Sequence, residues 1–178
     1  MKILLILFLS ISSYSMSQHL TYKEKKTIRR ELKAMLKSDQ QYRIELTNQQ
    51  NQSLKDSLWK LQSQNDSINK EKFKQIILNS GYPSLTRVGT ELSTVLILHF
   101  TNQNDFIELD ELFLSEIKTG NMPKMEYARW YDRCQINMGK LSRFGAYGNE
   151  KLCGDRLTEI NKNRLDFGLD AIVSSGCN

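Results

Sequence analysis

The stretch from Thr21 to Gln64 constrains the fold most, because it contains neither glycine nor proline and consists mostly of good helix formers. Apolar residues recur along it at spacings of three, four or seven, namely Ile28, Leu32, Met35, Tyr42 and Leu46. A second stripe, displaced by one residue, holds Leu54, Leu58 and Leu61. The pattern predicts either one long helix with an irregularity near Gln49–Ser53 or two helices.

The first half of this stretch is basic. Its seven basic residues are Lys23, Lys25, Lys26, Arg29, Arg30, Lys33 and Lys37. A basic amphipathic helix can bind an acidic membrane or an acidic protein, whereas the simpler interpretation is a solvated helix face. We expect any protein partner or acidic envelope surface to bind here. The net charge of +5 over 178 residues is mild, and a nucleic acid partner is not expected for a secreted chain.

Shorter helices are predicted for the remaining chain from the signals at their ends. They are a helix capped by Asp66 or Ser67 and stopped at Gly81, an apolar helix over 88–100, one from Asn104 or Asp105 to Gly120, one from Pro123 to Gly139, and one around Arg156–Asp166. No alternating strand pattern of useful length occurs. The sequence predicts an all-α fold with a long N-terminal helix, a compact bundle of about four to five short helices and an irregular glycine-containing C-terminal segment.

The N-terminus has the order of a secretory signal peptide. Lys2 precedes a short apolar run from Ile3 to Leu9, and small and polar residues follow. The run is far shorter than the roughly 20 residues that span a bilayer, so no transmembrane anchor is expected after cleavage. We predict cleavage after Ser17, which makes 1–17 the signal peptide and the mature protein secreted or periplasmic. The predicted division of the mature chain is a basic, then Gln/Asn/Ser-rich helical segment at 18–64 and a compact helical domain at 65–178.

Three cysteines remain after the predicted cleavage. In an oxidising compartment the expected disulfide joins Cys153 to Cys177, which would tie down the C-terminus. Cys134 follows an aromatic cluster on a predicted helix, and we expect it to be a buried free thiol.

Several short motifs recur in a recognisable order. They are D-Q-x-x-R within "SDQQYR", D-x-x-N followed by G-Y-P from Asp66, an apolar helix ending in "LILHF", A-x-x-x-D-R at Ala128–Arg133, and R-x-x-x-G-L from Arg164. Together they resemble the bacterial domain-of-unknown-function family 6624 over roughly residues 35–170. The resemblance implies a fold and a set of residues but no reaction. This chain departs from the family pattern at Tyr82, where the family has Trp. It departs again at "SRFGAY", which replaces a Q-x-Y-G-T-Q run so that Ser142 takes the first Gln position.

The candidate catalytic residues are His99, Asp132 and Arg133, with His99 as a base that Asp132 would orient. Three further polar residues, Asp66, Asn69 and Arg164, are candidate ligand-binding residues. No metal site is expected, because His99 is the one credible histidine and no second ligand lies at helical or short-loop spacing. No phosphate-binding loop follows a strand, and no cofactor is expected.

An alternative interpretation makes these residues buried structural groups, since buried charges are seldom left unpaired. Asp132 would then accept hydrogen bonds from backbone amides of the Gly81–Gly89 loop or pair with Arg164. Two functional hypotheses follow. The first is a secreted or periplasmic binding or scaffold module that uses its basic helix. The second is a small hydrolase or ligand-binding enzyme that uses the cluster of His99, Asp132 and Arg133.

Overall fold

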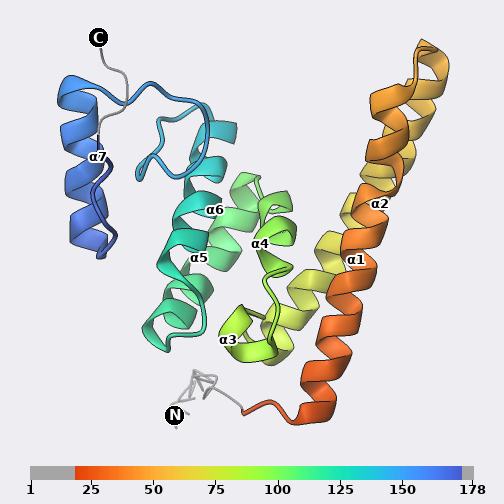
Figure 1. Cartoon of the computed structure of the whole chain (residues 1–178), viewed down its shortest axis with the longest axis horizontal. Helices are drawn as coiled ribbons and strands as arrows, with labels where there is room; N and C mark the ends of the chain where they lie inside the picture. Colours follow the sequence, from red (N-terminus) through yellow and green to blue (C-terminus); the bar gives the residue numbers. More distant parts are fainter. Residues whose placement is uncertain (1–18, 174–178) are drawn as a thin grey trace, which may run out of the picture.

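The protein is built from helices, as the sequence predicts. The computed structural model describes residues 19–173, and within this range the chain forms seven α-helices and one 3-10 helix but no strand. Figure 1 shows the long helices α1 and α2 at one end of the molecule, α3 and α4 beside them, α5 and α6 next, and α7 at the other end. The predicted signal peptide, its cleavage position and Cys177 lie outside the described residues.

Helix α1 (Tyr22–Asn48) begins at a capping box. The Thr21 hydroxyl accepts the backbone amide of Glu24, and the Glu24 carboxylate accepts the backbone amide of Thr21 at 2.7 Å. The helix buries one stripe, which consists of Ile28, Leu32, Met35 and Asp39. The predicted stripe is therefore buried from Ile28 to Met35 and is followed by the buried Asp39, whereas its last two residues, Tyr42 and Leu46, are only half-buried.

Helix α2 (Gln52–Ser80) runs antiparallel to α1, so the two-helix alternative is correct. The three residues 49–51 form the connection, and the Asn51 side chain caps α2 by accepting the amide of Leu54 at 3.2 Å. The tip of this hairpin projects beyond the other helices in Figure 1.

The prediction that a helix begins at Asp66 or Ser67 is wrong, because α2 is already helical from Gln52. Neither glycine nor proline interrupts the segment, so the polar residues before Asp66 continue the helix instead of capping a new one. The predicted division after residue 64 falls inside α2, and the polar tip and the core-facing end of the hairpin share that one helix.

The apolar segment over 88–100 is not one helix. The short helix α3 (Leu85–Val88) ends at its first residue, and α4 (Ser93–Leu96) and the 3-10 helix η1 (Ile97–His99) follow. Gly89 ends α3 in the left-handed region, with φ of 75°, a conformation that glycine adopts without steric cost. The chain then turns, and helix resumes at Ser93. Its end at His99 agrees with the prediction.

The remaining helices are α5 (Gln103–Lys118), α6 (Lys124–Asn137) and α7 (Gly154–Phe167). α5 begins at a capping box between Asn102 and Asp105, earlier than the predicted cap at Asn104 or Asp105, because Asp105 occupies the third helical position. Pro123 directly precedes α6, as expected for a helix start.

The core centres on Trp130 of α6, which is fully buried. Its ring lies edge-on to Phe113 with centroids 4.7 Å apart, and its indole Nε1 donates to the carbonyl of Phe100 at 2.8 Å. Cys134 lies one turn further along α6 and is buried and free, which confirms that prediction. Burial raises the pKa of the Cys134 thiol to about 12.

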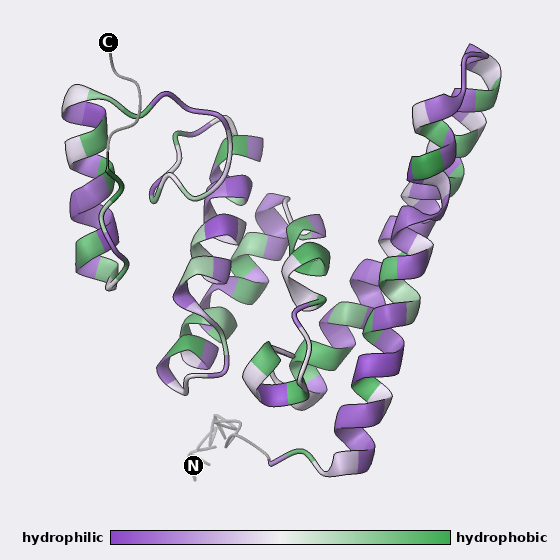
Figure 2. Ribbon diagram, viewed as in Figure 1, coloured by the Kyte–Doolittle hydropathy of each residue, from purple (hydrophilic) through white to green (hydrophobic). Residues whose placement is uncertain are grey.

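Hydrophilic and hydrophobic residues alternate along the helices rather than separating into long apolar spans (Figure 2). Between residues 19 and 173, no helix combines the length and the apolar character needed to cross a bilayer. The hairpin tip is largely exposed, in keeping with its enrichment in Gln, Asn and Ser.

Candidate functional site

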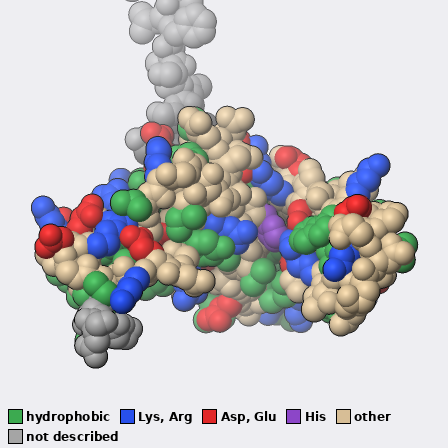
Figure 3. Space-filling model, turned by 90° about the horizontal axis from the view of Figure 1, so that it is seen from above, with side chains coloured by type: hydrophobic (Ala, Val, Ile, Leu, Met, Phe, Trp, Pro, Cys, Tyr) green, Lys and Arg blue, Asp and Glu red, His purple; other side chains and the backbone are tan. Residues whose placement is uncertain are grey.

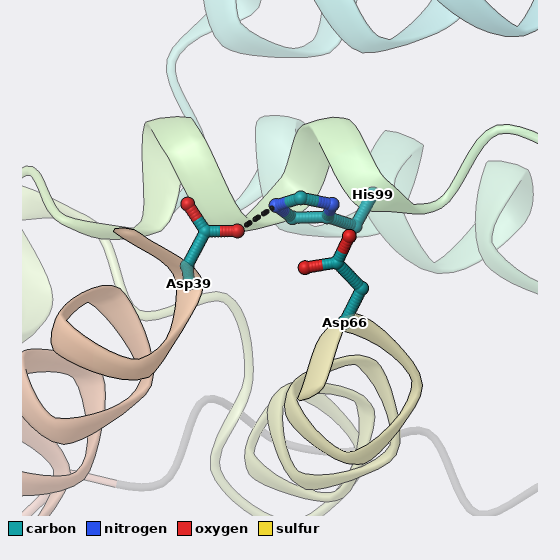
Figure 4. A group of neighbouring side chains, drawn as sticks. All are labelled: Asp39, Asp66 and His99. Carbon is teal, nitrogen blue, oxygen red and sulfur yellow. Dashed lines mark ion pairs between the residues drawn. The ribbon is translucent and has the colours of Figure 1, made fainter. Parts of the chain in front are cut away.

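Polar side chains from three separate segments meet where the hairpin packs against η1. Asp39 ends the buried stripe of α1, Asp66 belongs to α2, and His99 ends η1. In Figure 4 both carboxylates point toward the imidazole ring. Asp39 is 2% exposed, and the His99 side chain is 17% exposed. We call these three residues, with Arg43 and Gln62, the hairpin cluster.

Ion pairs connect the members of the hairpin cluster. His99 Nε2 lies 2.8 Å from Asp39 Oδ1. Arg43 Nη2 lies 2.8 Å from Asp66 Oδ2 and 3.3 Å from Asp39 Oδ1. The two carboxylates would repel each other in a partly buried setting, so the guanidinium between them offsets that repulsion. One ligand atom each from Asp39, Asp66 and His99 falls within a mutual distance of 4.8 Å.

Gln62 is fully buried and joins the two helices of the hairpin. Its Nε2 donates to Asp66 Oδ1 at 2.6 Å and to the backbone carbonyl of Asp39 at 2.9 Å. Its Oε1 is the one buried side-chain polar atom within residues 19–173 that has no hydrogen-bond partner. Buried polar atoms are nearly always paired, so this amide oxygen marks an unfilled interaction in the cluster.

Asn69 lies about one turn after Asp66 on α2 and is 5% exposed. Its Nδ2 donates to the carbonyl of Met35 at 3.0 Å, and its side chain also bonds the hydroxyl of Ser38. Ser38 and Asn69 border a groove of about 1020 Å³ between the two hairpin helices. The candidate ligand-binding residues Asp66 and Asn69 therefore face α1 side by side.

Asp132 is fully buried but holds a different part of the chain. Its Oδ1 accepts the backbone amides of Arg143 at 2.7 Å and Phe144 at 3.0 Å, and its Oδ2 accepts that of Ala146 at 2.7 Å. Burial raises the pKa of the Asp132 carboxyl, and the backbone amides partly offset that effect. The expectation that its partners are Gly81–Gly89 amides or Arg164 is wrong, because the glycine-containing segment after α6 folds back onto that helix.

Arg164 and Arg133 act on the same segment. Arg164 is 6% exposed and donates to the carbonyls of Phe144 at 2.9 Å and Asp170 at 2.6 Å. The Arg133 guanidinium lies 5.2 Å from the centroid of the Tyr147 ring, within the range of a cation–π contact. Both arginines thus contact the turn at 142–147, whose backbone amides donate to Asp132.

The structure brings together three of the candidate site residues, His99, Asp66 and Asn69, at the hairpin. It places the other three, Asp132, Arg133 and Arg164, around the segment after α6. Sequence reasoning left Asp39, Arg43 and Gln62 out of the site. A signal existed for Asp39, since it is an acidic residue at the position four after Met35 on an otherwise apolar stripe.

No protein-family model, no curated protein and no solved structure matches this chain. The resemblance to the domain-of-unknown-function family 6624 therefore stays a prediction. Motifs that carry the resemblance lie far apart in the sequence and meet in the hairpin cluster and beside it: Asp39 with Arg43, Asp66 with Asn69, and His99.

Proposed function

We propose that this protein is a secreted helical binding module whose first helix binds an anionic surface. The observation that carries the proposal is a stripe of exposed basic residues spaced three or four apart on α1, namely Lys23, Lys26, Arg30, Lys33 and Lys37. It extends about 21 Å along one helix face at 1.5 Å per residue. None of the five forms an ion pair with an acidic residue in the described part of the chain.

The surroundings of the basic stripe favour binding by charge rather than by insertion. Ile28, Leu32 and Met35 of α1 are at most 5% exposed. The exposed large apolar side chains of this helix, Tyr22 and Ile44, stand singly near its two ends, so the helix has no continuous apolar face to bury in a bilayer. Elsewhere, basic residues such as Lys70 and Arg156 have acidic partners. On the face in Figure 3, basic and acidic side chains are interspersed. A basic residue near an anionic surface contributes about 1 kcal/mol, so five can act together.

The alternative hypothesis, a small hydrolase or ligand-binding enzyme using His99, Asp132 and Arg133, has less support. Both oxygens of Asp132 accept backbone amides, and His99 pairs with Asp39 instead. A base and its orienting carboxylate must lie within hydrogen-bond reach of each other, and these two groups have other partners.

Co-sedimentation with lipid vesicles tests the proposal. Wild-type protein should bind vesicles that contain phosphatidylglycerol but not vesicles of phosphatidylcholine alone. The bound fraction should fall as salt rises from about 0.1 M to about 1 M, because the Debye length shrinks from about 10 Å to about 3 Å. Direct binding of a polyglutamate peptide in the absence of lipid tests for an acidic protein partner instead of an anionic lipid surface.

Two variants with the same change in net charge provide the control. The triple variant K26E/R30E/K33E reverses the stripe and should lose binding. The variant K118E/K140E/K151E reverses three exposed lysines elsewhere and should keep it. Equal loss in both variants, or no binding by wild type, would show that the stripe is an ordinary solvated face.

Secretion is part of the same proposal. Protein recovered from the periplasm or the culture medium should have the intact mass of a chain that begins at Gln18, give or take two residues, because the small residues before Gln18 suit signal peptidase. Recovered protein that retains Met1 would contradict it.

A further inference from the structure

We infer that the hairpin cluster is a binding site for a divalent transition-metal ion, with Asp39, Asp66 and His99 as ligands. Each offers one ligand atom, and the three atoms lie within 4.8 Å of one another. Around a tetrahedral ion with bonds of about 2.0–2.2 Å, two ligand atoms are about 3.3–3.6 Å apart, roughly 1 Å closer than these three atoms now are at most. Small side-chain rotations therefore bring all three atoms to bonding distance of a single ion.

The amide oxygen of Gln62 is a second and independent sign of a ligand. Gln62 is fully buried within the cluster, and its Oε1 has no hydrogen-bond partner among the described residues. Turning the amide over would place Oε1 against Asp66 Oδ1 and the carbonyl of Asp39, which are both acceptors, so these neighbours set its orientation. A cation beside the two carboxylates would give this oxygen a partner.

A divalent metal ion could take the place of the Arg43 guanidinium between the two carboxylates. Arg43 now supplies the positive charge between the carboxylates, but its side chain is 33% exposed and can turn toward solvent. A divalent ion would replace it with a larger charge. His99 Nε2 now lies 2.8 Å from Asp39 Oδ1, and it can bind a metal only without a proton on that nitrogen, so binding would leave one ring proton on Nδ1 and release any second proton to solvent. Binding would form coordinate bonds from His99 Nε2 and from one carboxylate oxygen each of Asp39 and Asp66 to the ion, and it would break the contacts of Arg43 with the two carboxylates.

The donor set indicates which ions fit. One imidazole nitrogen with two carboxylate oxygens suits Zn²⁺ or Mn²⁺, whereas Ca²⁺ and Mg²⁺ prefer sites with oxygen ligands alone. No spacing signal predicts this site, because its ligands come from three segments that only the packing of the hairpin against η1 brings together.

Isothermal titration calorimetry on purified, chelator-treated protein tests the inference with ZnCl₂ and MnCl₂, and with MgCl₂ and CaCl₂ for comparison. Wild type should bind one Zn²⁺ or Mn²⁺ per chain. The variants His99→Ala and Asp66→Asn should bind at least about tenfold more weakly. His19→Ala is the matched control, because His19 is the other histidine of the chain and is exposed. It should bind as wild type does.

Arg43→Ala separates a metal site from a purely structural ion network. If the cluster binds metal, removal of the competing guanidinium should tighten binding, and Zn²⁺ should raise the melting temperature of Arg43→Ala more than that of wild type. A purely structural network would lose stability in Arg43→Ala with no response to metal. Circular dichroism confirms that each variant is folded. Wild-type binding of both Zn²⁺ and Mn²⁺ weaker than about 1 mM, or equal binding by wild type and His99→Ala, would overturn the inference.

Discussion

Replacing Asp132 with alanine removes the acceptor of three backbone amides at once. The carboxylate is fully buried and accepts the amides of Arg143, Phe144 and Ala146 at 2.7–3.0 Å. These amides belong to a turn without regular structure, so no helix or sheet partner can replace the lost acceptor. The turn should loosen, and the protein should unfold more easily.

The size of the effect follows from the burial of the three donors. The Phe144 amide is buried, and leaving it unpaired costs about 1–3 kcal/mol. The amides of Arg143 and Ala146 are partly buried, so water can reach them, and we assign about 0.5–1 kcal/mol to each. The variant also avoids burying a charge, which offsets part of the loss. The expected net loss is about 2–4 kcal/mol, or a drop in melting temperature of about 5–15 °C for a chain of this size.

Urea unfolding followed by tryptophan fluorescence measures the loss, because Trp130 is fully buried. Asp132→Asn keeps one acceptor oxygen but turns an NH₂ group toward a donor, so its stability should lie between those of wild type and Asp132→Ala. Asp166→Ala changes an exposed carboxylate near the end of α7 and should stay within about 0.5 kcal/mol of wild type. An Asp132→Ala protein as stable as this control would refute the structural role of Asp132.

Raising the pH above about 9 should lower the free energy of unfolding, because burial raises the pKa of the Cys134 thiol from 9.0 to about 12 and that of the Tyr127 hydroxyl above 10.0. The native state keeps these protons while the unfolded chain loses them, so each group lowers the free energy of unfolding by about 1.4 kcal/mol for every pH unit above its pKa in the unfolded chain. A urea midpoint that stays constant from pH 7 to about 10.5 would contradict this. Gly145→Ala should destabilise the protein by about 2–5 kcal/mol and Gly120→Ala by about 1–2 kcal/mol. Both have positive φ, but only at Gly145 would the new Cβ meet a leucine methyl, at 2.6 Å, and equal thermal midpoints would argue against that clash. Limited proteolysis should cut first near the hairpin tip at 49–51, which projects from the bundle; a first cut within 88–100 would contradict this.

The sequence alone determined the features that depend on neighbours along the chain. Thr21 and Glu24 stand at capping-box spacing, and the structure forms that box. The stripe of Ile28, Leu32 and Met35 predicted which face of α1 is buried. Such signals succeed because a helix repeats every 3.6 residues and its ends satisfy their amides locally. The same local signals misled at Asp66, since a polar residue that can cap a helix can equally continue one.

Tertiary structure alone decided which polar groups meet. Asp39, Asp66 and His99 are distant in sequence, and their contact depends on the register of the hairpin helices and on where η1 crosses them. The sequence predicts that Asp132 is buried and either accepts Gly81–Gly89 amides or pairs with Arg164. Its actual partners, the amides of the 143–146 turn, depend on how the chain folds back after α6. A carboxylate can accept any amide within reach, so its chemistry predicts that it will be paired, and only packing determines with which group.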